Sequence, residues 1–183
     1  FNTMDYSSVN MSNGGNRVVV DLGIEKALDN GYHLDPLGAN TLVEDILKNI
    51  QRVIGTSADD TLYGNSYANV FVGGAGNDTI DAREGNDTIY GISGNNKLYG
   101  GVENDIIYGG TGNDTLDGGA GDDILDGRAR DASGVLVNTT DGNNTYIGAT
   151  GDDTMIGGAG RDTLYYASSE SGIKVTLHPT GTD

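Results

Sequence analysis

The chain has 183 residues, among them 31 Gly, 2 Pro and no Cys, and a formal net charge of −17. The strong negative charge argues against nucleic acid and against an anionic membrane surface as partners, and no apolar run is long enough for membrane insertion. The length suits one domain, and so much Gly with so little Pro fits neither a linker nor collagen.

The first 54 residues carry one clear strand signal and two ambiguous segments. Val18, Val20 and Leu22 alternate along residues 16–22 and predict a strand with one buried face. Residues 24–30 fit a loop or a short turn of helix. Residues 40–53 are ambiguous, because a capping box at 41–44 favours helix whereas the remainder is also compatible with an extended segment.

Residues 55–126 form eight consecutive nine-residue units without a change of phase, and three more follow from residue 139. Gly109-Gly-Thr-Gly-Asn-Asp-Thr-Leu-Asp117 is one of the clearest units. A fixed short period is the signature of a repeat architecture and decides the fold. The units start at Gly55, Gly64, Gly73, Ala82, Gly91, Gly100, Gly109, Gly118, Thr139, Gly148 and Gly157.

Position 8 of every unit is hydrophobic. One buried side chain in nine residues is too little for a core, but stacked coils of a solenoid layer such residues into one. Position 7 is mostly Thr, Ile or Val, which suits a short strand. The position-8 residues are Leu62, Phe71, Ile80, Ile89, Leu98, Ile107, Leu116, Leu125, Tyr146, Met155 and Leu164.

Position 6 of every unit is Asp or Asn. Carboxylates stacked at about 4.8 Å, the spacing of strands in a sheet, repel one another, so the stack needs a cation. Calcium accepts six to eight oxygen ligands in flexible geometry, whereas magnesium demands a tighter octahedron; zinc does not fit a chain whose only soft ligands are His33 and His178. The position-6 residues are Asp60, Asn69, Asp78, Asp87, Asn96, Asp105, Asp114, Asp123, Asn144, Asp153 and Asp162.

Residues 127–138 interrupt the period. Arg128, Arg130 and Asp131 are expected to be exposed, and residues 135–137 are compatible with a strand. Two interpretations stay open, an ordinary surface loop and a loop that binds a partner.

The end of the chain repeats its beginning. Residues 162–169 and 172–177 resemble residues 2–8 and 18–22, which suggests a larger repeat of roughly 155–160 residues and a further lead-in that starts at 166–183 and is truncated. The alternative is a pair of unrelated edge strands.

The units resemble the RTX (repeats-in-toxin) calcium-binding nonapeptide, Gly-Gly-x-Gly-x-Asp-x-hydrophobic-x. The resemblance implies an all-β fold, a right-handed parallel β-roll (a β-solenoid) in which two units form one coil. It implies lead-in strands at 1–54, which favours strand over helix for 40–53, a roll at 55–126, a loop at 127–138 and further roll at 139–165. It also implies calcium in the Gly/Asp-rich turns, between turns eighteen residues apart, and roughly five to eight ions at the ligand numbers that calcium needs.

The ligands implied by the resemblance are position-6 side chains and carbonyl groups of the Gly-rich turns. The side chains are Asp60, Asp78, Asp87, Asn96, Asp105, Asp114, Asp123, Asn144, Asp153 and Asp162. The Gly positions are Gly73, Gly74, Gly76, Gly91, Gly100, Gly109, Gly110, Gly112, Gly118, Gly119, Gly121, Gly157 and Gly158.

Several units depart from the pattern. Asn69, Asn96 and Asn144 lower the ligand charge and therefore the expected affinity. Tyr67 and Glu103 replace Gly at position 4, where a positive φ is costly for other residues. Sites that use the turn 64–69 are therefore the weakest candidates. The strongest predicted bridges join Asp60 to Asp78 and join Asp87, Asp105 and Asp123 in series, while Asp114 pairs with Asn96.

One outward face is more apolar than the other. Such a face usually marks a contact, so we expect it to be covered by the segment before Gly55, by residues 128–138 or by a second chain; the alternative is a scattered, partly exposed surface. Its side chains are Val70, Val72, Thr88, Tyr90, Ile106, Tyr108 and Ile124.

These features predict a calcium-binding module that is not an enzyme. A chain this acidic and this poor in apolar residues is expected to be unfolded without calcium, and binding free energy then becomes folding free energy. The resemblance implies a folding and spacer module of a secreted or cell-surface bacterial protein, a toxin, exoenzyme or adhesin, that leaves the cell unfolded by type I secretion. Gly64-Asn-Ser-Tyr-Ala68 lacks the last Gly of a nucleophile elbow. The alternative is a surface-recognition module that binds polysaccharide or ice.

Overall fold

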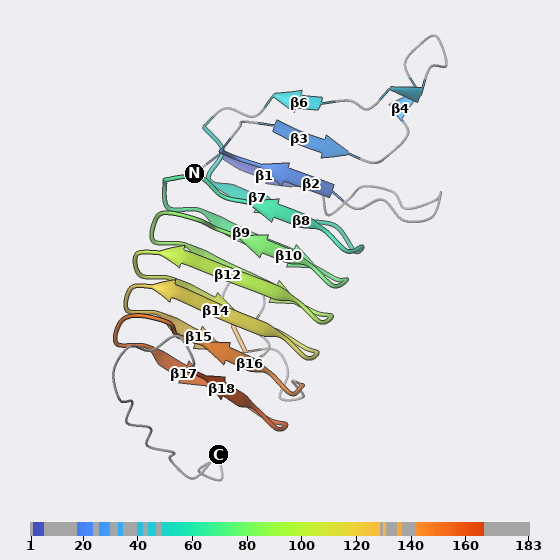
Figure 1. Ribbon diagram of the computed structural model, residues 1–183. Coiled ribbons are helices and arrows are strands. Elements are labelled where there is room, and N and C mark those ends of the chain that lie inside the picture. The colour runs from blue at the N-terminus through green and yellow to red at the C-terminus, as the bar shows by residue number, and fades with distance from the viewer. Residues whose placement is uncertain are drawn as a thin grey trace.

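The nine-residue period becomes a flat spiral in the computed structural model, with one short strand and one turn for each unit (Figure 1). The structure describes residues 2–5, 18–23, 26–29, 33–34, 40–41, 44–46, 49–128, 130, 135–136 and 142–166. Within these residues every regular element is a strand. The all-β parallel roll predicted from the sequence is confirmed.

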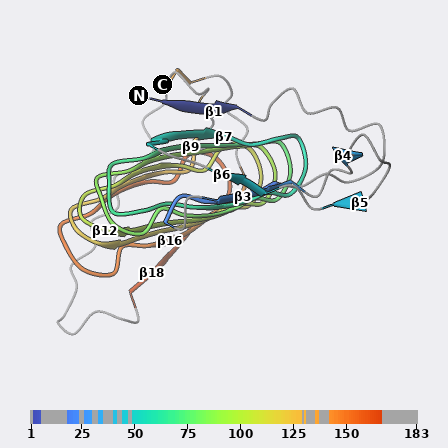
Figure 2. The same cartoon turned by 90° about the horizontal axis from the view of Figure 1, so that it is seen from above.

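Two sheets form the two faces of the roll, which Figure 2 shows along the stack, and the strands of the nine-residue units run parallel within each sheet. The seven-stranded sheet contains, in order, β1 (Thr3–Asp5), β7 (Arg52–Ile54), β9 (Val70–Gly74), β11 (Thr88–Ile92), β13 (Ile106–Tyr108), β15 (Ile124–Asp126) and β17 (Thr154–Ile156). The nine-stranded sheet contains β18 (Thr163–Tyr165), β16 (Thr145–Ile147), β14 (Thr115–Ala120), β12 (Lys97–Val102), β10 (Thr79–Asp81), β8 (Thr61–Tyr63), β2 (Val18–Asp21), β3 (Lys26–Asp29) and β6 (Glu44–Ile46).

Successive units alternate between the two sheets, so neighbours in one sheet lie eighteen residues apart. Thr61 pairs with Thr79, and Thr79 pairs with Lys97. Across the interruption the step changes, because Thr115 pairs with Thr145. The register of the stack therefore stays intact across the interruption.

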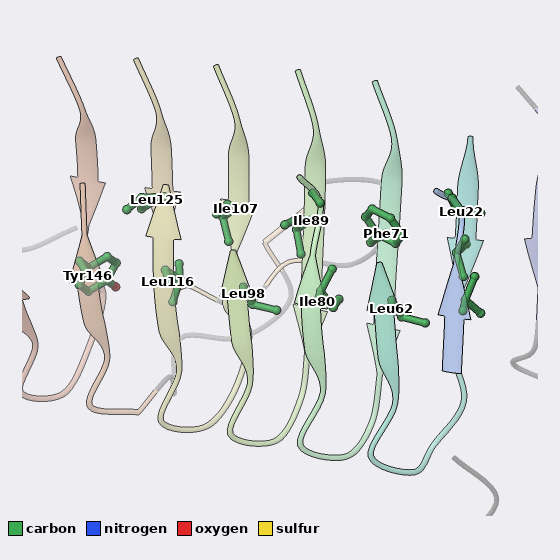
Figure 3. Packing of buried hydrophobic residues seen from close by; sticks show 13 residues of the cluster. Leu22, Leu62, Phe71, Ile80, Ile89, Leu98, Ile107, Leu116, Leu125 and Tyr146 are labelled. Atoms are coloured by element: carbon green, nitrogen blue, oxygen red, sulfur yellow. The ribbon is translucent and has the colours of Figure 1, made fainter. Parts of the chain in front are cut away.

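The position-8 side chains fill the space between the sheets (Figure 3). Each of them from Leu62 to Leu125 is 0% exposed, and Tyr146 is 1% exposed. Met155 packs against this core only in part. Leu164 is 37% exposed, because no described strand lies beyond β18 in its sheet. The predicted core therefore forms over nine consecutive units and thins in the last two.

The lead-in region joins the roll through two strands. β2 runs parallel to β8, with Val20 opposite Leu62, and Val20 and Leu22 are buried in the same core. β1 runs parallel to β7 at the end of the other sheet. The strand predicted around residues 18–22 is confirmed.

Two further predictions for the lead-in can be compared with the structure. Residues 24–30 were expected to be a loop or a helical turn, but residues 26–29 are strand β3, which pairs antiparallel with β2 and β6. The pairing with two neighbours outweighs the weak local signal. Most of the described part of 40–53 is strand, in β5 (Asn40–Thr41), β6 and β7, and β5 pairs with β4 (His33–Leu34). Asn49 lies in a bend with φ of 55°. The predicted further lead-in at 166–183 lies almost entirely outside the described residues.

The apolar outer face belongs to the seven-stranded sheet and is covered in part. The guanidinium of Arg130 lies 5.1 Å from the ring centroid of Tyr108, and Tyr108 stacks on Tyr90 with centroids 5.0 Å apart. Val72 is only 6% exposed, whereas Ile124 is 39% exposed. Residue 130 belongs to the interrupting segment, so one of the expected covers contacts this face; cover for its remainder stays a prediction.

Candidate metal centre

The position-6 side chains form two rows, one along each edge of the roll. The first edge carries Asp60, Asp78, Asn96, Asp114, Asn144 and Asp162, from the turns that lead into the nine-stranded sheet. The second edge carries Asn69, Asp87, Asp105, Asp123 and Asp153, from the turns that lead into the seven-stranded sheet. All nine position-6 residues before Asp153 are buried: seven are 1% exposed, and Asp60 and Asp114 are 2% exposed. The structure thus brings together, in rows, the side chains singled out in the sequence.

One oxygen of each position-6 side chain from Asp78 onward links neighbouring coils. The backbone N–H of Asp87, for example, donates to Oδ1 of Asp105 at 2.8 Å, and the N–H of Asp105 donates to Oδ1 of Asp123 at 2.8 Å. Nine such bonds, of 2.6–3.1 Å, run along the two edges. Asp and Asn both supply this acceptor, which explains why the repeat tolerates either residue.

The second carboxylate oxygen is the one that needs a cation. Oδ2 of Asp78, Asp87, Asp105 and Asp123 is buried and has no hydrogen-bond partner. A buried charge without a partner is strongly unfavourable. These oxygens therefore fit a bound cation.

Backbone oxygens lie beside these carboxylates. A Cβ added to Gly100 would collide with Oδ2 of Asp105 and would lie 2.7 Å from the carbonyl oxygen of Gly118 in the next coil. A Cβ on Gly73 would likewise collide with Oδ2 of Asp78 and would lie 3.1 Å from the Gly91 carbonyl oxygen. Glycine at position 1 thus keeps open the space where a carboxylate and a carbonyl of successive coils face each other.

Burial strongly favours the protonated form of these carboxyl groups in the absence of an ion. Desolvation raises the pKa of Asp78 and Asp105 from 3.8 to about 7 and that of Asp87 to about 8, although the N–H bond from the preceding coil opposes the rise. Burial also raises the pKa of Asp123 and Asp153. At neutral pH a bound divalent cation would replace these protons and remove the repulsion along the row.

Glycine at positions 2 and 4 serves backbone geometry. Both positions have positive φ in the six turns of the units that start between residues 73 and 118, for example 115° at Gly74 and 107° at Gly76. Glu103 was expected to be strained at position 4 and has φ of 73°. The same expectation for Tyr67 was wrong, because Tyr67 is not among the residues with positive φ. At position 2, Arg83, Ile92 and Ala149 hold φ of 74°, 78° and 59°.

Near two of the Asn residues, protein donors approach the position-1 carbonyl groups or their neighbours. Nδ2 of Asn96 lies 3.5 Å from the carbonyl oxygens of both Gly94 and Gly109. Near Asn144, the hydroxyl of Tyr146 donates to the carbonyl oxygens of Ile156 and Gly157, at 3.0 and 3.1 Å. In these coils amide and hydroxyl donors thus approach carbonyl groups, whereas in other coils the carbonyl groups face a carboxylate.

A second row of side chains, at position 5, also links the coils and was not predicted to do so. Oδ1 of Asn77 accepts from the N–H of Asn95, and Oδ1 of Asn95 accepts from the N–H of Asn113, both at 2.8 Å. The direction is opposite to that of the position-6 bonds, since each side chain here accepts from the following coil. The high frequency of Asn and Asp at position 5 was the signal in the sequence for this row.

Two ion pairs fasten the segments outside the regular units. Arg83 binds Asp21 of β2 through both guanidinium nitrogens, at 2.8 and 3.1 Å. Asp126 accepts hydrogen bonds from the side chains of Arg128 and Arg130, and these bonds outweigh its burial and lower its pKa. Arg128 and Arg130 were expected to be exposed, but their side chains are only 32% and 20% exposed, because a buried carboxylate holds them.

Residues 135 and 136 are exposed, and residue 136 makes a single bridge to Arg130.

The donor set points to a site made of both side chains and backbone. No group of three or more His, Cys, Asp or Glu side chains that could hold a metal occurs in the described part of the chain, so carboxylates alone do not complete a coordination shell. Carboxylate and carbonyl oxygens together are the ligand type that calcium prefers. Separately, no helix among the described residues is long and apolar enough to cross a membrane.

Comparison with known families agrees with this chemistry. The family model for the RTX calcium-binding nonapeptide repeat (four copies) matches residues 54–89, 90–125 and 138–168, which is more than half of the chain. No curated protein sequence matches the chain. The repeats of the chain form a structural calcium-binding module. The chain belongs to the family of proteins with the RTX calcium-binding nonapeptide repeat.

Proposed function

We propose that this chain is a calcium-dependent folding and spacer module of a secreted or cell-surface bacterial protein. The observation that carries the proposal is the set of buried Oδ2 atoms without a hydrogen-bond partner on Asp78, Asp87, Asp105 and Asp123. Bound calcium would neutralise these carboxylates. The position-6 side chains and the position-1 carbonyl groups would hold the ion, and the position-8 residues form the hydrophobic core. The parent is a toxin, exoenzyme or adhesin.

The charge of the chain supports a switch between an unfolded and a folded state. The chain has a net charge of −17 and few apolar residues. Repulsion among its carboxylates therefore disfavours a compact state unless cations bind. Extracellular calcium modules typically bind at roughly 10⁻⁴–10⁻³ M. Such sites are empty in a cytosol and filled outside the cell, which would suit export in an unfolded state.

A surface-recognition role for polysaccharide or ice is the second candidate. The regular position-5 rows would be its basis, because Asn and Asp recur there at the spacing of the coils. Their Oδ1 atoms are already engaged with the next coil, which leaves fewer groups for a ligand and favours the calcium role.

The test is a calcium titration of the EDTA-treated chain followed by far-UV circular dichroism. We expect a cooperative gain of β signal near millimolar calcium and none with magnesium, since magnesium requires a tighter octahedral site. An EDTA-treated chain that already has the full β signal and does not respond to calcium would contradict the proposal. A thermal-hysteresis assay and a glycan array test the second candidate.

A further inference from the structure

The first two turns of the roll are closed by hydrogen bonds of their own. In the turn 55–60, the N–H of Thr56 donates to Oδ2 of Asp60 at 2.6 Å and the Thr56 hydroxyl bonds Oδ1 at 3.1 Å. In the turn 64–69, the N–H of Asn65 donates to Oδ1 of Asn69 at 3.1 Å. Oδ2 of Asp60 therefore has a donor where the equivalent atom of Asp78 has none.

The backbone separates the same two groups of turns. Thr56, Ala58, Asn65 and Tyr67 hold positions 2 and 4 of the first two turns, and none of them has a positive φ. Every described position-2 residue from Gly74 onward has one. A change of sign in φ at position 2 reorients the peptide that precedes it, which explains why the N–H of this peptide reaches the position-6 side chain in the first two turns.

A side chain supplies a cation at this end of the second edge. Nη1 of Arg83 donates to the carbonyl oxygen of Gly64 at 2.9 Å and to Asp21 at 2.8 Å, and the guanidinium lies 5.2 Å from the centroid of the Tyr63 ring. Gly64 occupies position 1, whose carbonyl faces a carboxylate in later coils. The guanidinium thus neutralises Asp21 and satisfies this carbonyl without a metal ion.

The first coil also has a core on both sides. Val20 and Val53, from the lead-in strands β2 and β7, are 0% exposed, as are Leu62 and Phe71 of the coil itself. Apolar burial of this kind does not depend on an ion.

We propose that the coil of residues 55–72, together with β2 and β7, folds without calcium and is the template on which the calcium-binding coils from residue 73 onward assemble. This inference rests on the proposed calcium role and adds the position along the roll at which calcium is first required. Asp60, predicted as a ligand from the sequence, is here assigned to a hydrogen-bonded turn. The ion-requiring turns begin with 73–78 on the first edge and 82–87 on the second.

Hydrogen exchange of the full chain, read by mass spectrometry with and without calcium, tests the order directly. In EDTA we expect peptides covering residues 53–72 to exchange slowly and peptides covering residues 97–126 to exchange as an unfolded chain. With calcium, both should be protected. Protection of 53–72 that appears only with calcium overturns the inference and leaves the calcium role intact. Full protection of both regions in EDTA contradicts the calcium role itself.

Two matched substitutions at position 6 test the assignment of Asp60. Asp105→Asn removes a carboxylate whose Oδ2 has no hydrogen-bond partner, so we expect fewer bound calcium ions and a calcium midpoint raised by about tenfold. Asp60→Asn keeps an oxygen that accepts from Thr56, so the number of ions and the midpoint should not change. Isothermal titration calorimetry on both full-length variants gives the comparison. Loss of calcium in Asp60→Asn equal to that in Asp105→Asn would overturn the assignment.

Discussion

The first coil of the roll, residues 55–72, and the coils from residue 73 onward share one period and one core but differ in their turns. In the first coil the position-6 side chains accept hydrogen bonds from position 2 of the same turn. In the later coils glycine at positions 2 and 4 allows a different backbone, and buried carboxylate oxygens are left without a donor. The same repeat can therefore be closed by hydrogen bonds or by an ion, and the sign of φ at position 2 marks the difference.

The largest effect is expected in the core that the two regions share. Leu62→Ala and Leu98→Ala each remove a fully buried side chain at position 8, so each should lower the free energy of unfolding by about 2–5 kcal/mol in saturating calcium. Urea unfolding followed by circular dichroism measures this.

The same two substitutions should have different effects in the two regions when calcium is removed. In EDTA, Leu62→Ala should abolish the slow hydrogen exchange of residues 53–72, while Leu98→Ala should change nothing, because its coil is already unfolded. A loss of that protection in Leu98→Ala would mean that the two regions fold as one unit.

Acid should partly replace calcium in the later coils. The folded-state pKa of Asp78, Asp87 and Asp105 is raised from 3.8 to about 7 or 8, so folding is favoured by protonation and this contribution is lost as the pH rises through those values. In EDTA, the protection of residues 97–126 should therefore increase as the pH falls from 8 to about 5.

The control for the pH experiment is the chain in saturating calcium. There the carboxylates are neutralised by the ion, and protection should not rise as the pH falls over the same range. Asp126 does not interfere, because the bonds from Arg128 lower its pKa and its contribution is lost only at more acidic pH. A later region that loses protection in EDTA as the pH falls from 8 to 5 would contradict the origin assigned to the shifts.

The ion pair of Arg83 should matter chiefly for the first coil. Arg83→Gln removes a bidentate bond to Asp21 and a bond to the Gly64 carbonyl. Because the pair is partly exposed, the expected loss is about 1 kcal/mol. In EDTA the exchange of residues 53–72 should become faster by about fivefold, since 1.4 kcal/mol corresponds to a factor of ten.

A matched control for Arg83 is Arg161→Gln. Arg161 is exposed, and its backbone N–H is what bonds Asn143, so its substitution should leave exchange in the first coil unchanged. Equal acceleration by the two substitutions would show an effect of net charge in place of a specific pair.

The roll and its core were predictable because they follow from a strict period. Hydrophobic residues at position 8, such as Leu98, and Asp at position 6, such as Asp105, recur every nine residues, and stacking places each kind in one row. The twelve-residue interruption could also be located, since the phase resumes at residue 139. The lead-in was harder, because β3 depends on pairing with β2 and β6 and not on local pattern.

The division between the two kinds of turn could not be predicted from the same pattern. Asp60 and Asp78 are identical at position 6, and only the sign of φ at Thr56 and Gly74 separates their surroundings. The partner of Arg83 is Asp21, 62 residues away, and no spacing rule joins them. These features depend on how the lead-in meets the first coil, which is a matter of tertiary contacts.

Substitutions at position 2 should have small effects of opposite sign in the two regions. Ile92 is a β-branched residue at φ of 78°, a conformation that costs roughly 1–3 kcal/mol, so Ile92→Gly should raise stability by about 0.5–1 kcal/mol after the greater chain entropy of Gly is subtracted. Thr56 has no positive φ, and its hydroxyl bonds Asp60 and the N–H of Ala58. Thr56→Gly should therefore lower stability by about 1–2 kcal/mol. Urea unfolding in calcium measures both, and a gain of stability in Thr56→Gly would show that the first turn prefers the backbone of the later ones.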